Sequence, residues 1–367
     1  MSVDPGGLAE FSVVFTDRAL NHMSARFQQV MRDISASLKA VYKAHSVAIV
    51  PGGGTYAMEA VARQLSPTDG PAALVLRNGW FSFRWTQIHA AIGAPEPHLC
   101  VARSAEGQFS PAPVDEVVAA IATHRPPVVY AAHVETAAGM VLPDAYLRAV
   151  ADAVHAAGGL FVLDCIASGA VWVDMADIGV DVLITAPQKG WSAPAAAGVV
   201  LLSEAGRAAV ASRQSTSFAV DLGRWMGIFD AYEAGGHAYH ATMPTDALRA
   251  FRDAIQATEA FGIARARAAQ EELGRRVREL LAARGFASVA APGFEAPGVV
   301  VSYTSDPEVR SGRAFAAQGV QVAGGVPLRC GEPDDFSTFR IGLFGLDKLA
   351  DVDGTVARLE AALDAMQ

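Results

Sequence analysis

Residues 163–192 read LDCIASGAVWVDMADIGVDVLITAPQKGWS, and this stretch contains the end of one predicted strand and the whole of a second. An apolar run that begins at Leu160 ends in Asp164, and a second run, residues 180–184, is followed by Gln188 and Lys189. Short apolar runs bounded by polar, glycine or proline residues predict buried strands. If both strands lie in one parallel sheet, Asp164 and Lys189 leave it at the same carboxyl edge, where open α/β sheets bind ligands.

A carboxylate and a lysine at one sheet edge suit the chemistry of pyridoxal phosphate. The lysine amine can form a Schiff base with the aldehyde of this cofactor, and the carboxylate can hold the ring nitrogen protonated, so that the ring accepts electrons. Each residue also has an ordinary alternative. An Asp at a strand end is usually a helix cap, and a Lys after a strand is usually a solvated loop residue.

The size and composition of the chain predict a large folded core. The chain has 367 residues, of which 51% are hydrophobic and 18% are charged. These values suit one large domain with a smaller one and argue against disorder. The net charge of -9 argues against nucleic acid or an anionic membrane as a partner.

The cysteines and the N-terminus bear on the compartment. Cys100, Cys165 and Cys330 form no disulfide framework, which is typical of a reducing compartment. The N-terminal residues lack the basic and apolar regions of a signal peptide, and no apolar run reaches membrane-spanning length. We therefore expect a cytoplasmic protein without a membrane segment, and the sequence predicts no metal site.

Helical and strand patterns alternate through most of the chain. Helical periodicity over residues 24–43 is followed by a strand at residues 47–50, and a further strand is expected at residues 128–134. This alternation, with short loops, predicts an α/β fold in which a mostly parallel sheet is covered by helices on both faces.

The pattern changes near residue 261. A long helix to residue 284, strands at residues 299–303 and 339–343, and a helix near residues 310–318 predict a smaller C-terminal α+β domain. The expected division is a lead-in at residues 1–20, a large cofactor-binding domain at residues 21–260 and a small domain at residues 261–367.

The loop Pro51-Gly52-Gly53-Gly54-Thr55 joins a predicted strand to a predicted helix. Glycines let backbone N–H groups approach an anion, and a helix N-terminus favours negative charge, so the loop could hold a phosphate. It contains neither GxGxxG nor GK[ST], which argues against a dinucleotide fingerprint and a P-loop. An ordinary turn between strand and helix is the alternative.

Six motifs occur in a fixed order along the chain: GGGTYAMEA, NGWFSFR, HVETAAG, QKGWSAP, YHAT and FRIGLFG, with the Asp164 stretch after the third. Together they resemble the class V, fold type I, pyridoxal-phosphate-dependent aminotransferases, above all the alanine/serine–glyoxylate branch. The resemblance covers nearly the whole chain, and it is the set of motifs that is specific. It implies transamination between a small amino donor of the alanine or serine type and a small 2-oxo acid such as glyoxylate or pyruvate.

The resemblance implies a role for each matching position. Lys189 would carry the cofactor and act as the catalytic base, Asp164 would pair with the ring nitrogen, and Phe81 would stack on the ring. Arg340 would bind the substrate carboxylate as a bidentate fork. The other implied cofactor contacts are Gly53, Gly54, Thr55, Thr136 and Gln188, with Tyr239 and Thr242 supplied by the partner subunit of a homodimer.

Two departures from the family pattern concern the substrate site. Ala137 and Ala138 stand where hydroxyl residues are commoner, and the lead-in lacks the usual Pro-Gly-Pro opening. Because this segment approaches the active site in the family, Asn21 and His22 are candidate substrate contacts. Arg340 lies in an apolar strand, and a buried arginine needs a partner, so we expect a carboxylate or a ligand beside it.

Other functions remain open. A 2-aminoethylphosphonate–pyruvate transaminase shares the chemistry but needs extra cations for the phosphonate, for which Arg84 and Arg329 are candidates. A cysteine desulfurase or lyase usually has His directly before the cofactor lysine, where this chain has Gln188. It also needs a reactive thiol, and the acidic neighbours of Cys330 would raise its pKa. A binding or scaffold protein would not need the whole set of site residues.

Overall fold

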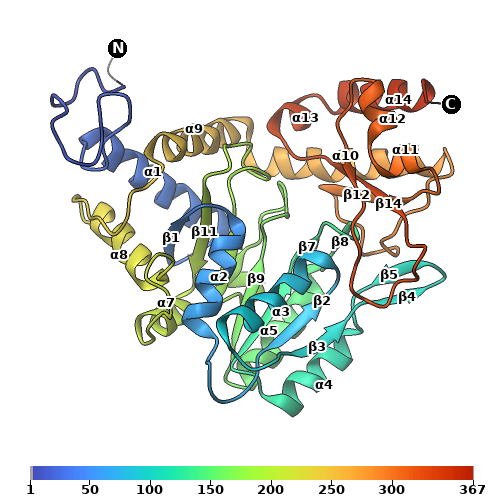
Figure 1. The fold of residues 1–367 in the computed structure, drawn as a ribbon, viewed down its shortest axis with the longest axis horizontal. Helices are drawn as coiled ribbons and strands as arrows, with labels where there is room; N and C mark the ends of the chain where they lie inside the picture. The colour runs from blue at the N-terminus through green and yellow to red at the C-terminus, as the bar shows by residue number, and fades with distance from the viewer. Residues whose placement is uncertain (1–2, 367) are drawn as a thin grey trace.

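The structure is a computed structural model that describes residues 3–366. Its centre is a seven-stranded sheet in the order β1-β11-β10-β9-β6-β2-β3 (Figure 1). Only β11 runs antiparallel to its neighbours in this sheet, which confirms the predicted mostly parallel α/β architecture. The strands are β1 (Ser46–Pro51), β2 (Leu74–Arg77), β3 (His98–Val101), β6 (Val128–Ala132), β9 (Leu160–Asp164), β10 (Val182–Thr185) and β11 (Ala197–Leu202).

Helices cover both faces of this sheet. Successive side chains of a strand point to opposite faces, and every residue of β6, β10 and β11 is buried, so neither face is open to water. The helices of this part are α1 (Ala25–Tyr42), α2 (Gly54–Leu65), α3 (Trp80–Ile92), α4 (Val114–His124), α5 (Asp144–Ala156), α6 (Met175–Ile178), α7 (Glu204–Ala211), α8 (Leu222–Glu233) and α9 (Thr245–Phe261).

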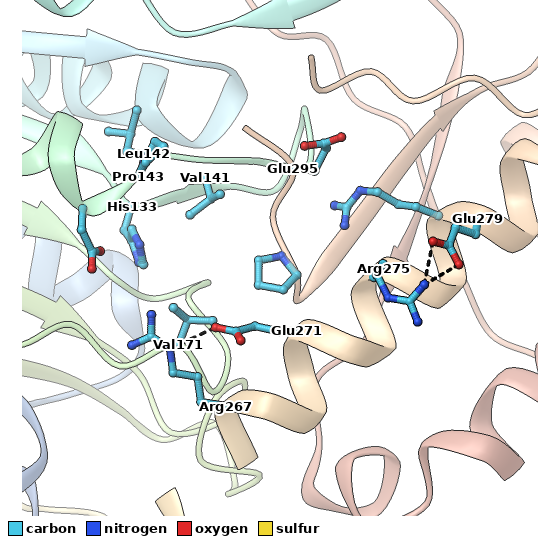
Figure 2. Close-up of a pocket in the computed structure, with 13 residues that line it drawn as sticks. His133, Val141, Leu142, Pro143, Val171, Arg267, Glu271, Arg275, Glu279 and Glu295 are labelled. Carbon is cyan, nitrogen blue, oxygen red and sulfur yellow. Dashed lines mark hydrogen bonds and ion pairs between the residues drawn. The ribbon is translucent and has the colours of Figure 1, made fainter. Parts of the chain in front are cut away.

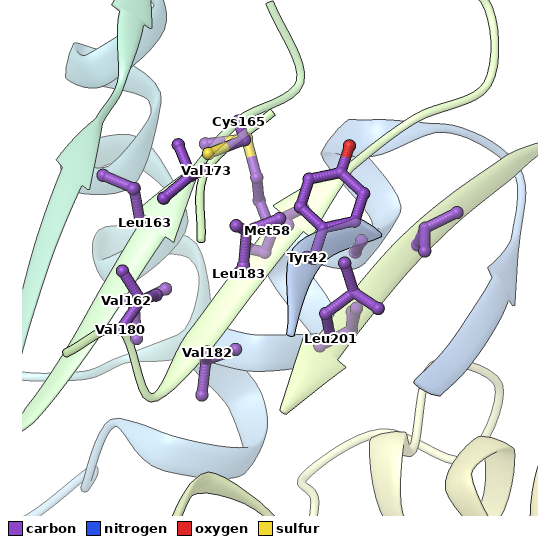
Figure 3. Close-up of a cluster of buried hydrophobic side chains, with 14 of the residues drawn as sticks. Tyr42, Met58, Val162, Leu163, Cys165, Val173, Val180, Val182, Leu183 and Leu201 are labelled. Atoms are coloured by element: carbon purple, nitrogen blue, oxygen red, sulfur yellow. The ribbon is translucent and has the colours of Figure 1, made fainter. Parts of the chain in front are cut away.

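The strands that carry the site are fixed by the buried core. Leu163 and Leu183 are fully buried and lie opposite each other in the parallel pairing of β9 with β10 (Figure 3). The next pair in this register joins Ile184 to Asp164. Because a shift of one residue would turn the whole apolar set away from the core, packing also determines where Asp164 emerges.

A three-stranded sheet and five helices form the C-terminal part, at the upper right of Figure 1. α9 ends at Phe261, Gly262 adopts a φ of 105°, and α10 begins at Ile263, close to the expected start of a long helix. The elements are α10 (Ile263–Ala282), β12 (Val299–Tyr303), α11 (Pro307–Arg310), α12 (Arg313–Ala317), β13 (Ala323–Gly324), β14 (Thr338–Gly342), α13 (Leu346–Ala350) and α14 (Val352–Asp364).

Two expected elements differ in the structure. The strand expected at residues 128–134 leaves the sheet after Ala132, because its neighbour β9 ends at Asp164. Its continuation, β7 (Val134–Glu135), pairs instead with β8 (Met140–Val141). The helix expected at residues 310–318 is two short helices, since the chain turns between Arg310 and Arg313.

A small hairpin was not expected from the sequence. It consists of β4 (Arg103–Ala105) and β5 (Gln108–Ser110), and the side chains of β4 are exposed. Strands this short carry too few residues to show an alternating pattern. No helix within residues 3–366 is both long enough and apolar enough to cross a bilayer.

Candidate active site

A cavity of about 120 Å³ lies at the carboxyl edge of β9 and β10. Seven of the predicted cofactor contacts line it, although they come from separate parts of the chain: Gly54, Thr55, Phe81, Thr136, Asp164, Gln188 and Lys189. Met58, Arg84, Val134, Ile166 and Ala167 complete the lining. The fold therefore brings most of the predicted site residues to one place.

Asp164 is the last residue of β9 and only 6% exposed. Its Oδ1 accepts a hydrogen bond of 2.9 Å from the backbone N–H of Ile166. Burial raises its pKa to about 6, while this hydrogen bond and the nearby Lys189 act in the opposite direction. Within residues 3–366 its Oδ2 accepts no hydrogen bond, which leaves one carboxylate oxygen for a donor in the cavity.

Lys189 lies in the loop that follows β10. Burial lowers its pKa, the cations Arg84 and Arg340 act in the same direction, and Asp164 opposes them. The loop passes very close to the turn after Asp164. A Cβ atom on Gly190 would come within 2.2 Å of the Gly169 carbonyl oxygen, so only glycine fits directly after this lysine.

The glycine-rich loop brings the first turn of α2 to the cavity. Gly53 is the N-cap of α2, and Gly54 and Thr55 begin the helix. A Cβ atom on Gly54 would lie 2.4 Å from the end of the Ile166 side chain, so any larger residue there would require Ile166 to move. Gly53 itself does not line the cavity. The N-terminus of α2, a twelve-residue helix, can hold an anion beside Gly54 and Thr55.

Glu135 holds the start of α3 beside the cavity, a function that the sequence did not indicate. It is 1% exposed, and its carboxylate accepts hydrogen bonds from the backbone N–H groups of Phe81, Ser82 and Ala137, at 2.8 to 3.2 Å, and from the Ser82 hydroxyl. It thereby fixes the helix that carries Phe81 and Arg84. The only signal was its position at a strand end within HVETAAG.

Arg340, on β14, lies on the same side as Phe81. Its Nε donates to the Gly324 carbonyl at 2.8 Å, and its guanidinium lies 5.7 Å from the centre of the Phe81 ring. Burial lowers its pKa, and Glu135 opposes this shift. The sequence led us to expect either a carboxylate or a ligand beside Arg340. Within residues 3–366 Arg340 forms no ion pair, so a ligand is the remaining candidate.

Tyr239 and Thr242 do not line the cavity of their own chain. They lie in the exposed segment between α8 and α9, where the Tyr239 hydroxyl is 3.0 Å from the Thr242 hydroxyl. His22 is buried against the Tyr239 ring, at 5.3 Å between centroids. Asn21 donates to Glu10 at 2.8 Å. Neither Asn21 nor His22 lines the cavity in its own chain.

A second cavity, of about 670 Å³, lies beside α10 and contains none of the predicted cofactor contacts (Figure 2). The arginines that line it already have partners, as in the pair of Arg275 with Glu279. His133 also lines it, and burial together with nearby Arg267 lowers the His133 pKa to about 4. These groups do not form a second catalytic constellation.

The cavity at the carboxyl edge of β9 and β10 offers a complementary group for each part of pyridoxal phosphate. Lys189 would meet the aldehyde, and the Asp164 Oδ2 is free for the ring nitrogen. Phe81 and Ile166 also line the cavity and offer apolar contact for the ring. The first turn of α2 and the guanidinium of Arg84 would face the phosphate. The residues present therefore fit this cofactor.

Comparisons with known proteins agree with this geometry. Residues 12–326 match the family model described as aminotransferase class-V. A 2-aminoethylphosphonate–pyruvate transaminase of Burkholderia ambifaria is 28% identical and aligns over 96% of this chain and 92% of its own length. The alanine–glyoxylate aminotransferase of Rattus norvegicus is 25% identical over 95% of this chain and 83% of its own length.

Solved structures show the same fold. The crystal structure of an alanine–glyoxylate aminotransferase from Nostoc sp. has a TM-score of 0.80 at 23% identity, and the match covers 94% of this chain and 89% of the other. A pyridoxamine–pyruvate aminotransferase from Mesorhizobium loti has a TM-score of 0.79 at 18% identity, covering 95% and 87% of the two chains. The chain thus belongs to the class-V aminotransferases and is a fold type I enzyme that depends on pyridoxal phosphate.

Proposed function

We propose that this enzyme transfers an amino group from a small donor of the alanine or serine type to a small 2-oxo acid, glyoxylate or pyruvate. The observation that carries the proposal is the placement of Asp164 and Lys189 at adjacent parallel strand ends, in one cavity with Phe81. The names of relatives that act on alanine and glyoxylate, or on pyruvate, support this substrate class.

Lys189 would move the proton in this reaction. Bound pyridoxal phosphate supplies an electron sink for the bonds at the donor's α-carbon. Because burial lowers the pKa of Lys189, its Nζ is a neutral base at lower pH than an exposed lysine would be. The Nζ would take the α-proton of the donor and return it on the same face of the cavity.

The remaining groups would bind and orient. Asp164 would stabilise a protonated ring nitrogen, and Arg340 would hold the carboxylate of the donor through its fork of N–H groups. The Arg340 guanidinium lies 5.7 Å from the centre of the Phe81 ring, and the Lys189 Nζ lies 5.9 Å from the centre of the Phe344 ring. We infer that aromatic rings beside both groups would favour a donor with a small side chain.

2-Aminoethylphosphonate is a second candidate donor, because the Burkholderia ambifaria relative carries that name. Of the two cations considered for its phosphonate, Arg329 lies over the Trp80 and Phe83 rings and does not line the cavity. Only Arg84 does. A desulfurase is disfavoured because it needs a reactive thiolate. Burial, with a smaller contribution from the carboxylates of Glu135 and Glu332, raises the pKa of the Cys330 thiol to about 12.

The assembly and the division of the chain are part of the same proposal. A homodimer would bring Tyr239 and Thr242 of one subunit to the cofactor of the other. The domain boundary is proposed at residues 260 and 261, next to the break between α9 and α10. A cytoplasmic location is supported by three cysteines that all lack a disulfide partner.

The test is the near-visible absorption spectrum of the purified enzyme, with alanine, serine and 2-aminoethylphosphonate added separately. We expect a band that alanine or serine converts to the pyridoxamine form. Lys189→Ala should lower turnover by about 1,000-fold or more, as loss of a catalytic base does. Arg329→Gln is the matched control and should retain wild-type turnover. A Lys189→Ala variant that still transaminates at an appreciable rate would refute the assigned base.

A further inference from the structure

The phosphate end of the cavity receives no charged side chain from the glycine-rich loop. Gly53 and Gly54 offer only backbone, and Thr55 offers a hydroxyl. A phosphate monoester carries about 1.5 to 2 negative charges at neutral pH, whereas a helix N-terminus supplies about half a positive charge. A dianion in this position therefore calls for a cation from another element.

Arg84 is the one residue that meets this need within the described chain. Among residues 3–366, Arg84 and Lys189 are the only cations that line the cavity, and the Lys189 amine would be taken by the aldehyde. The Arg84 Nη1 donates to the Thr55 Oγ1 at 2.8 Å, so the guanidinium lies against the first turn of α2. Within residues 3–366 Arg84 has no carboxylate partner, and its other N–H groups have no acceptor.

The direction of Arg84 is fixed by its own helix. Its guanidinium lies 5.3 Å from the centre of the Phe81 ring, and Glu135 anchors the first turn of α3 that carries both residues. Stacking on an aromatic ring and a hydrogen bond to a hydroxyl restrict a long side chain before any ligand arrives. A preorganised guanidinium loses less freedom when it binds a phosphate.

Two other arginines near α3 are directed elsewhere. Arg329 lies 5.4 Å from the Trp80 ring and 5.8 Å from the Phe83 ring, and it does not line the cavity. Arg340 donates to Gly324 and lies over Phe81, without lining the cavity. The three arginines therefore occupy distinct positions, and only one contacts the phosphate loop.

We propose that Arg84 is the cation of the phosphate site, and that it makes the enzyme select the phosphorylated cofactor over unphosphorylated pyridoxal. The guanidinium would bind the phosphate beside Thr55, as an arginine fork suits a phosphate dianion. The inference rests on the proposed function of the cavity. It also implies that Arg84 is not available to a substrate phosphonate, which weighs against 2-aminoethylphosphonate as the donor.

The test compares two aldehydes that both can bond to Lys189 and differ only in the phosphate. Cofactor-free wild type, Arg84→Gln, Arg84→Lys and the control Arg329→Gln are titrated with pyridoxal phosphate and with pyridoxal, followed by absorption. We expect Arg84→Gln to weaken pyridoxal phosphate binding by about 10- to 100-fold, the worth of a charged hydrogen bond, and to leave pyridoxal binding within about twofold. The affinity of Arg84→Lys for pyridoxal phosphate should lie between those of wild type and Arg84→Gln, and the affinity of Arg329→Gln should match that of wild type.

The possible outcomes separate the two proposals. If wild type gives a band with neither aldehyde, the proposed function falls and the inference with it. If wild type prefers pyridoxal phosphate and Arg84→Gln keeps the same preference, the inference alone is overturned. Thermal unfolding of the cofactor-free variants checks folding. Should Arg84→Gln not fold, Arg84→Met, which keeps an apolar side chain of similar length and removes the charge, is titrated instead and should reduce the preference in the same direction, whereas an unchanged preference would count against Arg84.

Discussion

At the scale of single residues, the site consists of charged groups whose burial is unfavourable without a ligand. Asp164 is buried and Arg340 is partly buried. Among residues 3–366, one carboxylate oxygen of Asp164 has no donor and Arg340 has no carboxylate partner. Lys189 is buried enough for its pKa to fall. Each carries a desolvation cost that a bound ligand of opposite charge would offset.

Asp164 gives the cofactor-free protein a pH dependence of known sign. Its folded-state pKa, about 6, lies above the ordinary value of 3.8. The folded state therefore binds the extra proton, and its stability falls as pH rises from about 4 to about 6. The difference amounts to about 3 kcal/mol, so Asp164→Asn should stabilise the cofactor-free protein by up to this amount at about pH 8.

Urea unfolding of the cofactor-free proteins at about pH 4 and about pH 8 measures this effect. Asp164→Asn should gain stability relative to wild type only at the higher pH, although it should lose catalysis. Asp152→Asn, an exposed substitution in α5, is the matched control and should follow wild type at both values. If the free energies of unfolding of Asp164→Asn and wild type differed by the same amount at both pH values, the raised pKa of Asp164 would be contradicted.

At the scale of elements, α3 and its anchor Glu135 organise one wall of the cavity. The first turn of a helix has N–H groups without partners in the helix, and here a buried carboxylate from β7 accepts two of them. A negative charge near a helix N-terminus is also favourable. One side chain thus sets the position of Phe81 and Arg84 together.

Removal of the Glu135 carboxylate should destabilise the fold and loosen this wall. In Glu135→Ala the buried N–H groups of Phe81, Ser82 and Ala137 lose their acceptor, and each such loss costs about 1 to 3 kcal/mol. We expect the free energy of unfolding to fall by about 3 kcal/mol or more. Hydrogen exchange at the first turn of α3 should accelerate.

The matched control is Glu116→Ala, which removes an exposed carboxylate that pairs with Arg103 on the surface. Surface pairs of this kind contribute about 0 to 1 kcal/mol. A Glu135→Ala variant as stable as Glu116→Ala, with unchanged exchange at α3, would show that Glu135 does not anchor the helix.

At the scale of the whole molecule, the described chain leaves apolar side chains in water. Leu8, Phe11 and Val13 in the lead-in are almost fully exposed, and Phe218 is 80% exposed. His22, two residues beyond the lead-in, has Phe15 of the lead-in and Tyr239 as ring neighbours, so it links the lead-in to the segment with Tyr239 and Thr242 through side-chain contacts. Exposed apolar groups of this size are typical of surfaces that another chain covers.

A shared active site can be tested by mixing two inactive variants. Lys189→Ala removes the base, and the double variant Tyr239→Phe with Thr242→Ala removes the contacts proposed to come from the partner. In a hybrid dimer one site would have its own Lys189 and an intact partner segment. Coexpression should then restore activity in about one quarter of the sites, as random pairing in a two-fold dimer predicts.

Sedimentation of each variant shows whether both still form dimers. Coexpression of two Lys189→Ala chains with different tags is the control and should give no activity. If dimers form but the mixed population stays inactive, Tyr239 and Thr242 act within their own subunit, and the shared site is wrong.

The class of fold and most of the cavity lining could be predicted from the residues alone and from the family that their motifs resemble. Apolar runs ending in Asp164 and before Lys189 predicted two parallel strands, since a buried strand must be apolar on both faces. The family resemblance implied Gly54, Thr55, Phe81 and Gln188 as cofactor contacts, and all four line the cavity, whereas Gly53, implied in the same way, does not. These features can be predicted from a local pattern because the burial of a strand and the close approach of backbone both depend on residue type.

Which charged groups lie near the cavity, and which helices they hold, could be seen only in the folded chain. Glu135 and Arg84 lie 51 residues apart in the sequence, and nothing in their local patterns indicated that one would fix the helix of the other. The structure also directed Arg329 away from the cavity and Arg84 into it, although both had seemed equal candidates. Side-chain direction depends on helix phase and on packing between distant segments, which a single sequence does not specify.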